Sequence, residues 1–95
     1  MTDVTLAPGF RVTYDRLSDV LYVTRRPGVP ARSREGDPGL VWRFDTVSGD
    51  LVGLTVIDFE RYWAGRREHL AAQISQRFGI TPREAETLVA SVAAV

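Results

Sequence analysis

The first two-thirds of the chain contain short runs in which hydrophobic and polar positions alternate. Apolar and polar side chains alternate over residues 10–15, and residues 20–24, 40–45 and 51–57 form three further runs rich in β-branched or aromatic residues. A period of two is typical of strands with one buried face. We therefore expect four strands, the last two joined by a hairpin loop over the Gly-containing residues 46–50.

The segment between the second and third predicted strands is rich in Pro and Gly. Residues 26–39 read RPGVPARSREGDPG, and each Pro removes a backbone donor that a central strand needs. We expect a long connection, within which residues 31–35 are candidates for a short edge strand. Residues 1–8 are expected to form a loose tail, which leaves the four strands to follow one another as a simple antiparallel meander.

The hydrophobic period changes to that of a helix after Asp58. One face of a helical wheel carries Phe59, Trp63, Leu70 and Ile74. Because Asp is a favourable N-cap residue, Asp58 predicts a helix that begins at Phe59.

Two glycines and a capping motif divide the C-terminal third of the chain. Gly65 weakens the middle of the first helix and favours a break there, whereas Gly79 suits the left-handed residue that ends a helix. Thr81 and Glu84 have the spacing of a capping box on either side of Pro82. The second helix is therefore expected to begin at Pro82.

Together these patterns predict an α+β fold with the element order ββββαα. A four-stranded antiparallel β-meander over residues 10–58 is followed by a helical pair over residues 59–95, packed on one sheet face. The length of 95 residues fits a single domain over residues 1–95. The expected core consists of Phe10, Val12, Tyr14, Val20, Tyr22, Trp42, Phe44, Leu54, Val56, Trp63, Leu70, Ile74, Leu88 and Val92.

Composition narrows the classes of function and the location. The 12 basic residues, all of them Arg, balance 12 acidic residues, and a net charge of zero argues against general capture of nucleic acid or anionic membrane. The absence of Cys excludes disulfides and Cys-based zinc sites. The sequence has no recognisable signal peptide or membrane-spanning stretch, so we expect a cytoplasmic protein.

Two of the predicted strands are apolar on both faces, which a sheet with one solvated face does not need. This holds for residues 20–23 and 51–57, and the C-terminal residues 90–95 are also unusually apolar. We expect another copy of the chain to cover the second sheet face, as in a homodimer. Candidate interface residues are Leu21, Val23, Leu51, Ile57 and Val95.

Three short motifs in the strands are shared with a known family. They are Tyr14-Asp15 at a strand end, Leu21-Tyr22 in the next strand, and Leu51-Val52-Gly53-Leu54 in the return strand of a hairpin. Over about residues 10–58 the chain resembles a bacterial family catalogued as domain of unknown function 2283. The resemblance implies a small β-sheet domain, no known catalytic residues, and an antitoxin-like role with a small toxin-like protein as partner.

Four aspartates form the first candidate site. In a meander, the first and third strands end at the sheet edge where the second and fourth begin, which gathers Asp15, Asp19, Asp45 and Asp50. Such an acidic rim suits a hard cation or an Arg-rich partner. Each Asp also lies in a predicted turn, where Asp is favoured for its backbone hydrogen bonds, and turn chemistry is the simpler explanation.

Residues 70–88 resemble a helix-turn-helix unit, the second candidate. Candidate nucleic-acid contacts are Arg66, Arg67, Arg77, Arg83 and Thr87. The second helix offers one Arg against two Glu, a weak electrostatic footprint for DNA. A helix pair that packs on the sheet or on a partner explains the same pattern, so DNA binding or autoregulation is the alternative function.

Catalysis has no recognisable motif in this sequence. The single histidine, His69, lies in a polar stretch without HxxxH or HExxH spacing, which favours a solvated helix residue. No serine lies in a motif such as GxSxG. The sequence therefore predicts a protein-interaction module that is not an enzyme and that holds no metal or cofactor.

Overall fold

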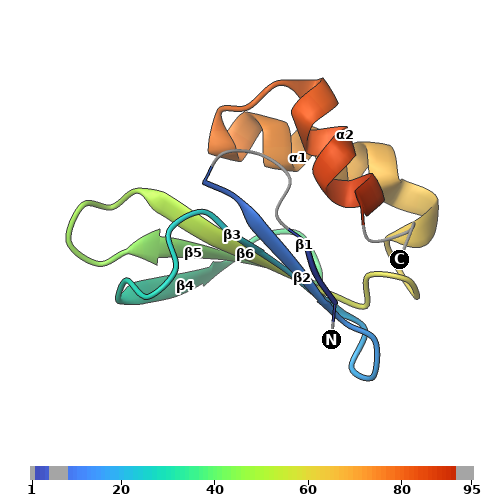
Figure 1. Ribbon diagram of the computed structural model, residues 1–95, viewed down its shortest axis with the longest axis horizontal. Helices are drawn as coiled ribbons and strands as arrows, with labels where there is room; N and C mark the ends of the chain where they lie inside the picture. The colour runs from blue at the N-terminus through green and yellow to red at the C-terminus, as the bar shows by residue number, and fades with distance from the viewer. Residues whose placement is uncertain (1, 5–8, 92–95) are drawn as a thin grey trace.

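The computed structural model consists of one sheet and one layer of helices (Figure 1), and it describes residues 2–4 and 9–91. The strands are β1 (Thr2–Val4), β2 (Arg11–Asp15), β3 (Val20–Thr24), β4 (Ala31–Glu35), β5 (Leu40–Asp45) and β6 (Leu51–Ile57). A short 3₁₀ helix, η1 (Ala64–Arg66), precedes the helices α1 (Arg67–Phe78) and α2 (Pro82–Ser91). The predicted α+β class, antiparallel sheet and helical pair are confirmed.

The sheet holds more strands than the four predicted. Residues 11–57 supply five strands, because the candidate edge strand over residues 31–35 forms β4. The short β1 adds a sixth beside β2, within the segment expected to be a loose tail. The prolines around β4 lie outside the strand itself, so they remove no donor from its ladder.

The strand order is β1-β2-β3-β6-β5-β4, so the predicted simple meander is wrong. Strand β3 pairs with β6, from Val20 opposite Ile57 to Thr24 opposite Gly53, and not with β5. The long connection after β3 reaches the far edge of the sheet, and β4, β5 and β6 then return toward β3. This order places the most apolar strand, β6, in the interior of the sheet, where both of its edges are paired.

The buried face of β3 is the opposite of the predicted one. Leu21 and Val23 are buried, whereas Val20 is only partly buried and Tyr22 is 37% exposed. The β2–β3 turn explains this, because its register sets Leu21 opposite Tyr14 and so on the helix-covered face. A shift of one residue in register changes the face of every side chain in a strand.

The first helix begins later than predicted. Asp58 has a φ of 57° and does not cap a helix; residues 58–63 form turns, and α1 starts at Arg67 after η1. The irregular turns still bury Phe59 and Trp63, as the helical stripe had suggested. The sequence therefore located these two core residues correctly but assigned them to the wrong local structure.

The turn between the helices has the predicted form. Gly79 is left-handed, with a φ of 70°, and its N–H donates to the carbonyl oxygen of Ser75. The Thr81 N–H donates to Oε1 of Glu84 at 3.0 Å, and the Glu84 N–H donates to Oγ1 of Thr81 at 3.1 Å. The capping box is thus confirmed, and Pro82 is the first residue of α2.

Both helices lie over one face of the sheet (Figure 1), and the core fills the space between the two layers. The largest fully buried side chains are Trp42, Trp63, Phe59, Leu21, Leu40, Leu54, Leu70, Ile74, Leu88, Val12, Val23 and Val56. Tyr14 and Phe44 are partly buried against this core, and the predicted core residue Val92 lies outside the described residues. None of the described helices is both long and apolar enough to cross a membrane.

Candidate functional site

The four aspartates of the predicted acidic rim lie at two opposite ends of the sheet. Asp15 and Asp19 flank the β2–β3 turn, whereas Asp45 and Asp50 flank the β5–β6 turn. Because β6 pairs antiparallel with β3, the start of β6 lies beside the end of β3 and not beside its beginning. A rim of four aspartates requires a simple meander, and the strand order of this sheet is different.

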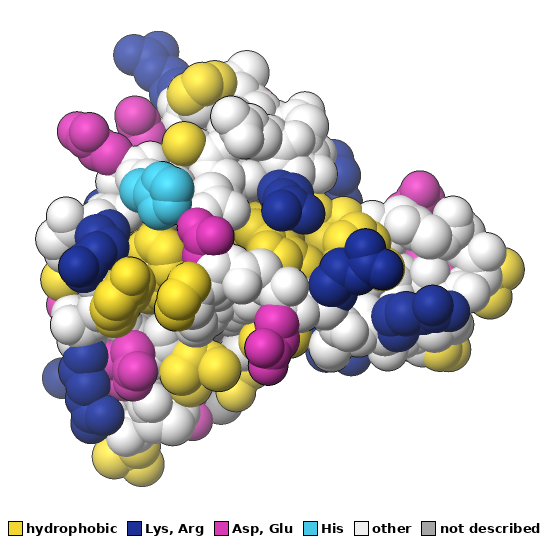
Figure 2. Space-filling view, turned by 180° about the vertical axis from the view of Figure 1, so that it is seen from behind, with side chains coloured by type: hydrophobic (Ala, Val, Ile, Leu, Met, Phe, Trp, Pro, Cys, Tyr) yellow, Lys and Arg dark blue, Asp and Glu magenta, His cyan; other side chains and the backbone are white. Residues whose placement is uncertain are grey.

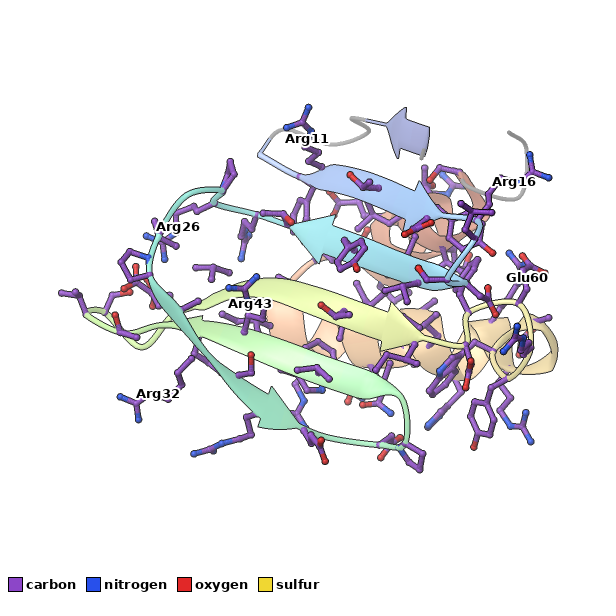
Figure 3. All side chains as sticks on the ribbon, turned by 90° about the horizontal axis from the view of Figure 1, so that it is seen from below. Arg11, Arg16, Arg26, Arg32, Arg43 and Glu60 are labelled. Atoms are coloured by element: carbon purple, nitrogen blue, oxygen red, sulfur yellow. The ribbon has the colours of Figure 1, made fainter. Side chains whose placement is uncertain are left out.

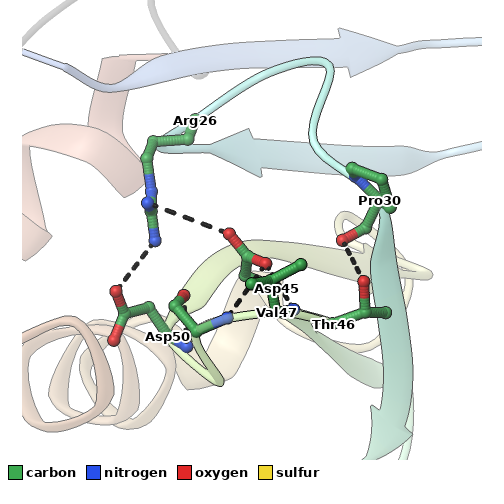
Figure 4. Close-up of polar contacts among 7 residues, drawn as sticks. Arg26, Pro30, Asp45, Thr46, Val47 and Asp50 are labelled. Carbon is green, nitrogen blue, oxygen red and sulfur yellow. Dashed lines mark hydrogen bonds and ion pairs between the residues drawn. The ribbon is translucent and has the colours of Figure 1, made fainter.

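Asp45 and Asp50 share the guanidinium of Arg26 (Figure 4). The Nη2 atom of Arg26 lies 3.0 Å from Oδ2 of Asp50, and Nη1 lies 3.9 Å from Oδ2 of Asp45. Asp45 also accepts the backbone N–H groups of Val47 and Ser48, which lower its carboxyl pKa. Asp45 therefore stabilises the β5–β6 turn, as turn chemistry predicts. Through Arg26, the two aspartates also hold the loop between β3 and β4.

At the other end of the sheet, Asp19 is a buried structural carboxylate. It is 6% exposed and accepts the Tyr14 hydroxyl at 2.7 Å and the N–H groups of Glu60 and Arg61 at 2.9 and 3.1 Å. Asp15 accepts turn N–H groups at its own strand end. In the part of the chain that the structure describes, no group of three or more acidic, His or Cys side chains is placed to hold a metal ion.

The basic residues of the helix-turn-helix candidate do not form one surface. Arg66 and Arg67 lie before and at the start of α1, where Arg66 stacks on Tyr62 and Arg67 pairs with Glu60 at 2.9 Å. Arg77 lies near the opposite end of α1, over the ring of Trp42. The remaining candidates are Arg83 and Thr87, which are both exposed on α2. The Thr87 hydroxyl donates to the carbonyl oxygen of Arg83 within the helix.

The histidine is part of a small polar cluster that the sequence analysis missed. Nε2 of His69 lies 3.1 Å from Oδ2 of Asp37, Gln73 donates to the same carboxylate, and the imidazole stacks on Trp63. The hydrogen bond from His69 lowers the pKa of Asp37 most. Figure 2 shows the histidine beside an acidic side chain. Asp37 and His69 both line a cleft of about 710 Å³.

No sequence signal joined these residues, because Asp37 lies in the Pro/Gly-rich connection and is 32 residues from His69. The cluster ties the β4–β5 turn to α1. Its cationic neighbours in the cleft, Arg66 and Arg67, already contact Tyr62 and Glu60.

Figure 3 views the sheet from the face that carries no helix. On this face, side chains of neighbouring strands form rows that run across the sheet. At one level of the register, Thr13, Tyr22, Thr55, Val41 and Glu35 follow one another across β2, β3, β6, β5 and β4. The next residues along β3 and β6 are Val20 and Ile57, which pair with each other. We call this helix-free side of the sheet the open face.

The open face is hollowed at one end by the loop that connects β3 to β4. The hollow has a volume of about 410 Å³, and its lining includes Tyr22, Arg43 and Val52. Arg43 lies on the open face beside this loop (Figure 3). A Cβ atom at Gly53, its cross-strand neighbour, would lie 3.7 Å from Cβ and 3.8 Å from Cδ of Arg43, so the Arg stem lies against this glycine.

Only part of the predicted interface lies on the open face. Leu21 and Val23 are buried in the chain's own core, so those two assignments are wrong. Leu51 is partly buried against the core, and Ile57 is 41% exposed beside Val20. Val95 lies outside the described residues. Side chains of β3 alternate between the two faces of the sheet. With the observed β2–β3 register, Tyr22, and not Leu21 or Val23, projects from the open face.

The comparisons with known proteins give one match. The model of a protein family of unknown function, DUF2283, matches residues 11–59, just over half of the chain. The chain belongs to the DUF2283 family. No curated protein and no solved structure matches it.

The DUF2283 segment coincides with one part of the fold. It begins at β2 and ends at Phe59, after β6, so it contains five of the strands and all of the open-face residues named above. The helices α1 and α2 lie beyond it. Within the DUF2283 segment, Gly53 and Arg43 shape the hollow, and Asp19 holds the turn that follows β6.

Proposed function

We propose that this DUF2283 protein is a non-catalytic protein-interaction module that forms a homodimer through the open face of its sheet. The observation that carries the proposal is the exposed, partly apolar row on that face. Tyr22 and Ile57 remain 37% and 41% exposed, and Val20 and Val41 are only partly buried. Contiguous apolar surface of this kind favours contact with another protein.

The charges on the open face support a second copy as the occupant. Glu35 lies in the row of Tyr22, and Arg43 lies in the row that contains Gly53 and Thr24. When two open faces stack about a two-fold axis that reverses the strand direction, each Arg43 row lies over the other copy's Tyr22–Glu35 row. Opposite charges then face each other in both halves of the interface.

Sedimentation equilibrium at micromolar concentration tests the dimer, with Tyr22→Arg as the disrupting variant. We expect the native chain to sediment as a dimer and Tyr22→Arg as a folded monomer, because the new guanidinium would be buried beside Arg43. The matched control is Tyr62→Arg. Tyr62 is 39% exposed, close to the value for Tyr22, but lies in the turn before α1. A native monomer, or equal effects of both variants, contradicts the proposal.

An antitoxin-like role is the narrower form of this proposal. The resemblance to family members that look like partners of small toxin-like proteins supports it, and the role requires a bacterial, cytoplasmic protein. Co-expression with a toxin-like reading frame adjacent to the gene tests it. We expect the two proteins to co-purify stably, and we expect Tyr22→Arg or a substitution of another open-face residue to abolish this. Growth arrest that this chain does not relieve contradicts the role.

DNA binding by the helical pair is the second candidate. The observation in its favour is the sharply capped turn, which leaves Arg83 and Thr87 exposed on α2. A gel-shift at low salt with the DNA upstream of the gene tests it. DNA binding predicts a shift that weakens in Arg77→Gln and Arg83→Gln, and an absent or unaffected shift removes this candidate.

A further inference from the structure

Strand β4 ends the sheet on the side away from β1. It pairs with β5 only, from Ala31 opposite Asp45 to Glu35 opposite Val41. No described strand lies on its outer side, and four of its five residues are exposed. An edge of this kind carries a row of backbone donors and acceptors that another strand can pair with.

Two arginines project from β4 on the side of the sheet that the helices cover. Arg32 lies opposite Phe44 and Arg34 opposite Trp42, and both of those partners face the helix layer. Among the ion pairs of residues 9–91, neither Arg32 nor Arg34 has a carboxylate partner. Their positive charge is thus not neutralised within this part of the chain.

A hollow of about 420 Å³ lies next to these arginines. Its lining includes Phe44, which is partly buried, and Val47, which is 91% exposed. Asp45 also lines it, but this carboxylate is occupied by the turn N–H groups and by Arg26. Figure 2 shows a hydrophobic strip bordered by several basic side chains on this side of the molecule.

From this geometry we propose that β4 binds an extended acidic segment of another protein, which adds to the sheet as a further strand. Alternate side chains of a strand project to the same face, so carboxylates two residues apart would lie beside Arg32 and Arg34. An apolar side chain two residues beyond the carboxylates would project to the same face, toward the hollow that Phe44 and Val47 line. Backbone pairing supplies the binding energy, and the two arginines select for acidic sequence.

A second copy of this chain is a poor occupant of the same edge. Antiparallel pairing of two β4 strands about Ser33 places Arg32 of each copy opposite Arg34 of the other, and like charges directly opposite are destabilising. Nucleic acid is also disfavoured, because a net charge of zero gives the chain no general attraction for phosphates. This edge is separate from the open face, so the proposal does not rest on the homodimer.

A labelled peptide in which Glu alternates with Val tests the proposal by fluorescence anisotropy. We expect saturable binding that weakens with salt, and about fivefold or more weaker binding to Arg32→Gln/Arg34→Gln, from the loss of two partly exposed ion pairs. Arg83→Gln is the matched control, because Arg83 is an exposed arginine on α2. Its binding should equal that of the native chain.

Two further probes separate strand addition from simple charge attraction. A peptide of the same composition with its Glu residues in one block, and a backbone N-methylated version of the alternating peptide, should both bind several-fold more weakly. Amide shifts on binding should centre on residues 31–35. Equal binding of all peptides, tighter binding of a single-stranded oligonucleotide, or no difference between the arginine variants would overturn the proposal.

Discussion

At the scale of single residues, Asp19 links two parts of the chain that are far apart in sequence. It lies in the β2–β3 turn with a φ of 59°, and it accepts the N–H groups of Glu60 and Arg61 after β6. Burial opposes its ionisation, but the hydrogen bonds from Tyr14, Glu60 and Arg61 outweigh burial and lower its pKa. Conversely, burial and the bond to Asp19 raise the pKa of Tyr14 to about 12.

Asp19→Asn should lower the free energy of unfolding by about 1–3 kcal/mol, because an amide nitrogen would face the N–H of Arg61 or Glu60. Urea denaturation measures the change. Since the folded pKa of Asp19 is depressed, its contribution is complete above the ordinary value of 3.8 and is lost as the pH falls through the folded value. The difference between native chain and variant should therefore shrink in acid.

The control for this prediction is Asp50→Asn, whose carboxylate is exposed and contacts Arg26 in solvent. We expect its effect to stay within about 1 kcal/mol. An alkaline absorbance titration gives a second readout, because Asp19→Asn should return the pKa of Tyr14 toward 10. Equal unfolding energies for the two variants would show that Asp19 is only a turn residue.

At the scale of elements, the end of α1 and the start of α2 are fixed by local hydrogen bonds. The Gly79 N–H reaches Ser75, the Ser75 hydroxyl donates to the carbonyl oxygen of Ile80 at 2.7 Å, and the capping box closes α2. The turn therefore fixes the relative position of α1 and α2 through contacts within residues 75–84. Ala85 and Leu88 then face the core from α2.

Thr81→Ala should destabilise the protein by about 1 kcal/mol, because the Glu84 N–H loses its acceptor at the start of α2. Thermal unfolding followed by circular dichroism measures this. Thr87→Ala is the matched control. The Thr87 hydroxyl only bonds back to its own helix, and Ala has the higher helix propensity, so its unfolding temperature should not fall. Equal losses in both variants would contradict a capping role.

At the scale of the whole molecule, the β4–β5 turn fastens the two layers together. A Cβ atom at Gly36 would lie 2.6 Å from Nε1 of Trp42, and one at Gly39 would lie 3.4 Å from Nε1 of Trp63. The turn backbone therefore lies directly against both indoles. A side chain at Gly36 would clash with Trp42, and one at Gly39 would clash with the carbonyl oxygen of Ile57, 2.9 Å away. Asp37, between the two glycines, is held by α1 through His69 and Gln73.

This packing predicts that the DUF2283 segment does not fold alone in this protein. A chain that ends at Trp63 keeps every strand but loses Leu70, Ile74, Phe78 and Leu88, which cover the sheet core. We expect no cooperative unfolding transition and poor dispersion of its amide resonances, in contrast to the full chain. A cooperative transition in the fragment would show that the helices are dispensable for folding.

The sequence by itself determined the local features of this protein. Short hydrophobic runs predicted four of the five strands over residues 10–57, and Gly79 and the Thr81–Glu84 pair predicted the helix turn, because backbone conformation and nearby hydrogen bonds decide both. The family resemblance also came from these local motifs. Even Asp45 was correctly interpretable as a turn residue, since its carboxylate accepts the N–H of Val47, two residues on.

Only the tertiary structure decided which strands are neighbours, and the functional surfaces follow from that. Pairing of β3 with β6 separated Asp15 from Asp45, and the β2–β3 register moved Leu21 into the core and Tyr22 to the open face. The Asp37–His69 contact likewise joins a loop to a helix. The physical reason is that the order of the strands and the burial of β6 depend on contacts between segments distant in sequence. No local pattern contains those contacts.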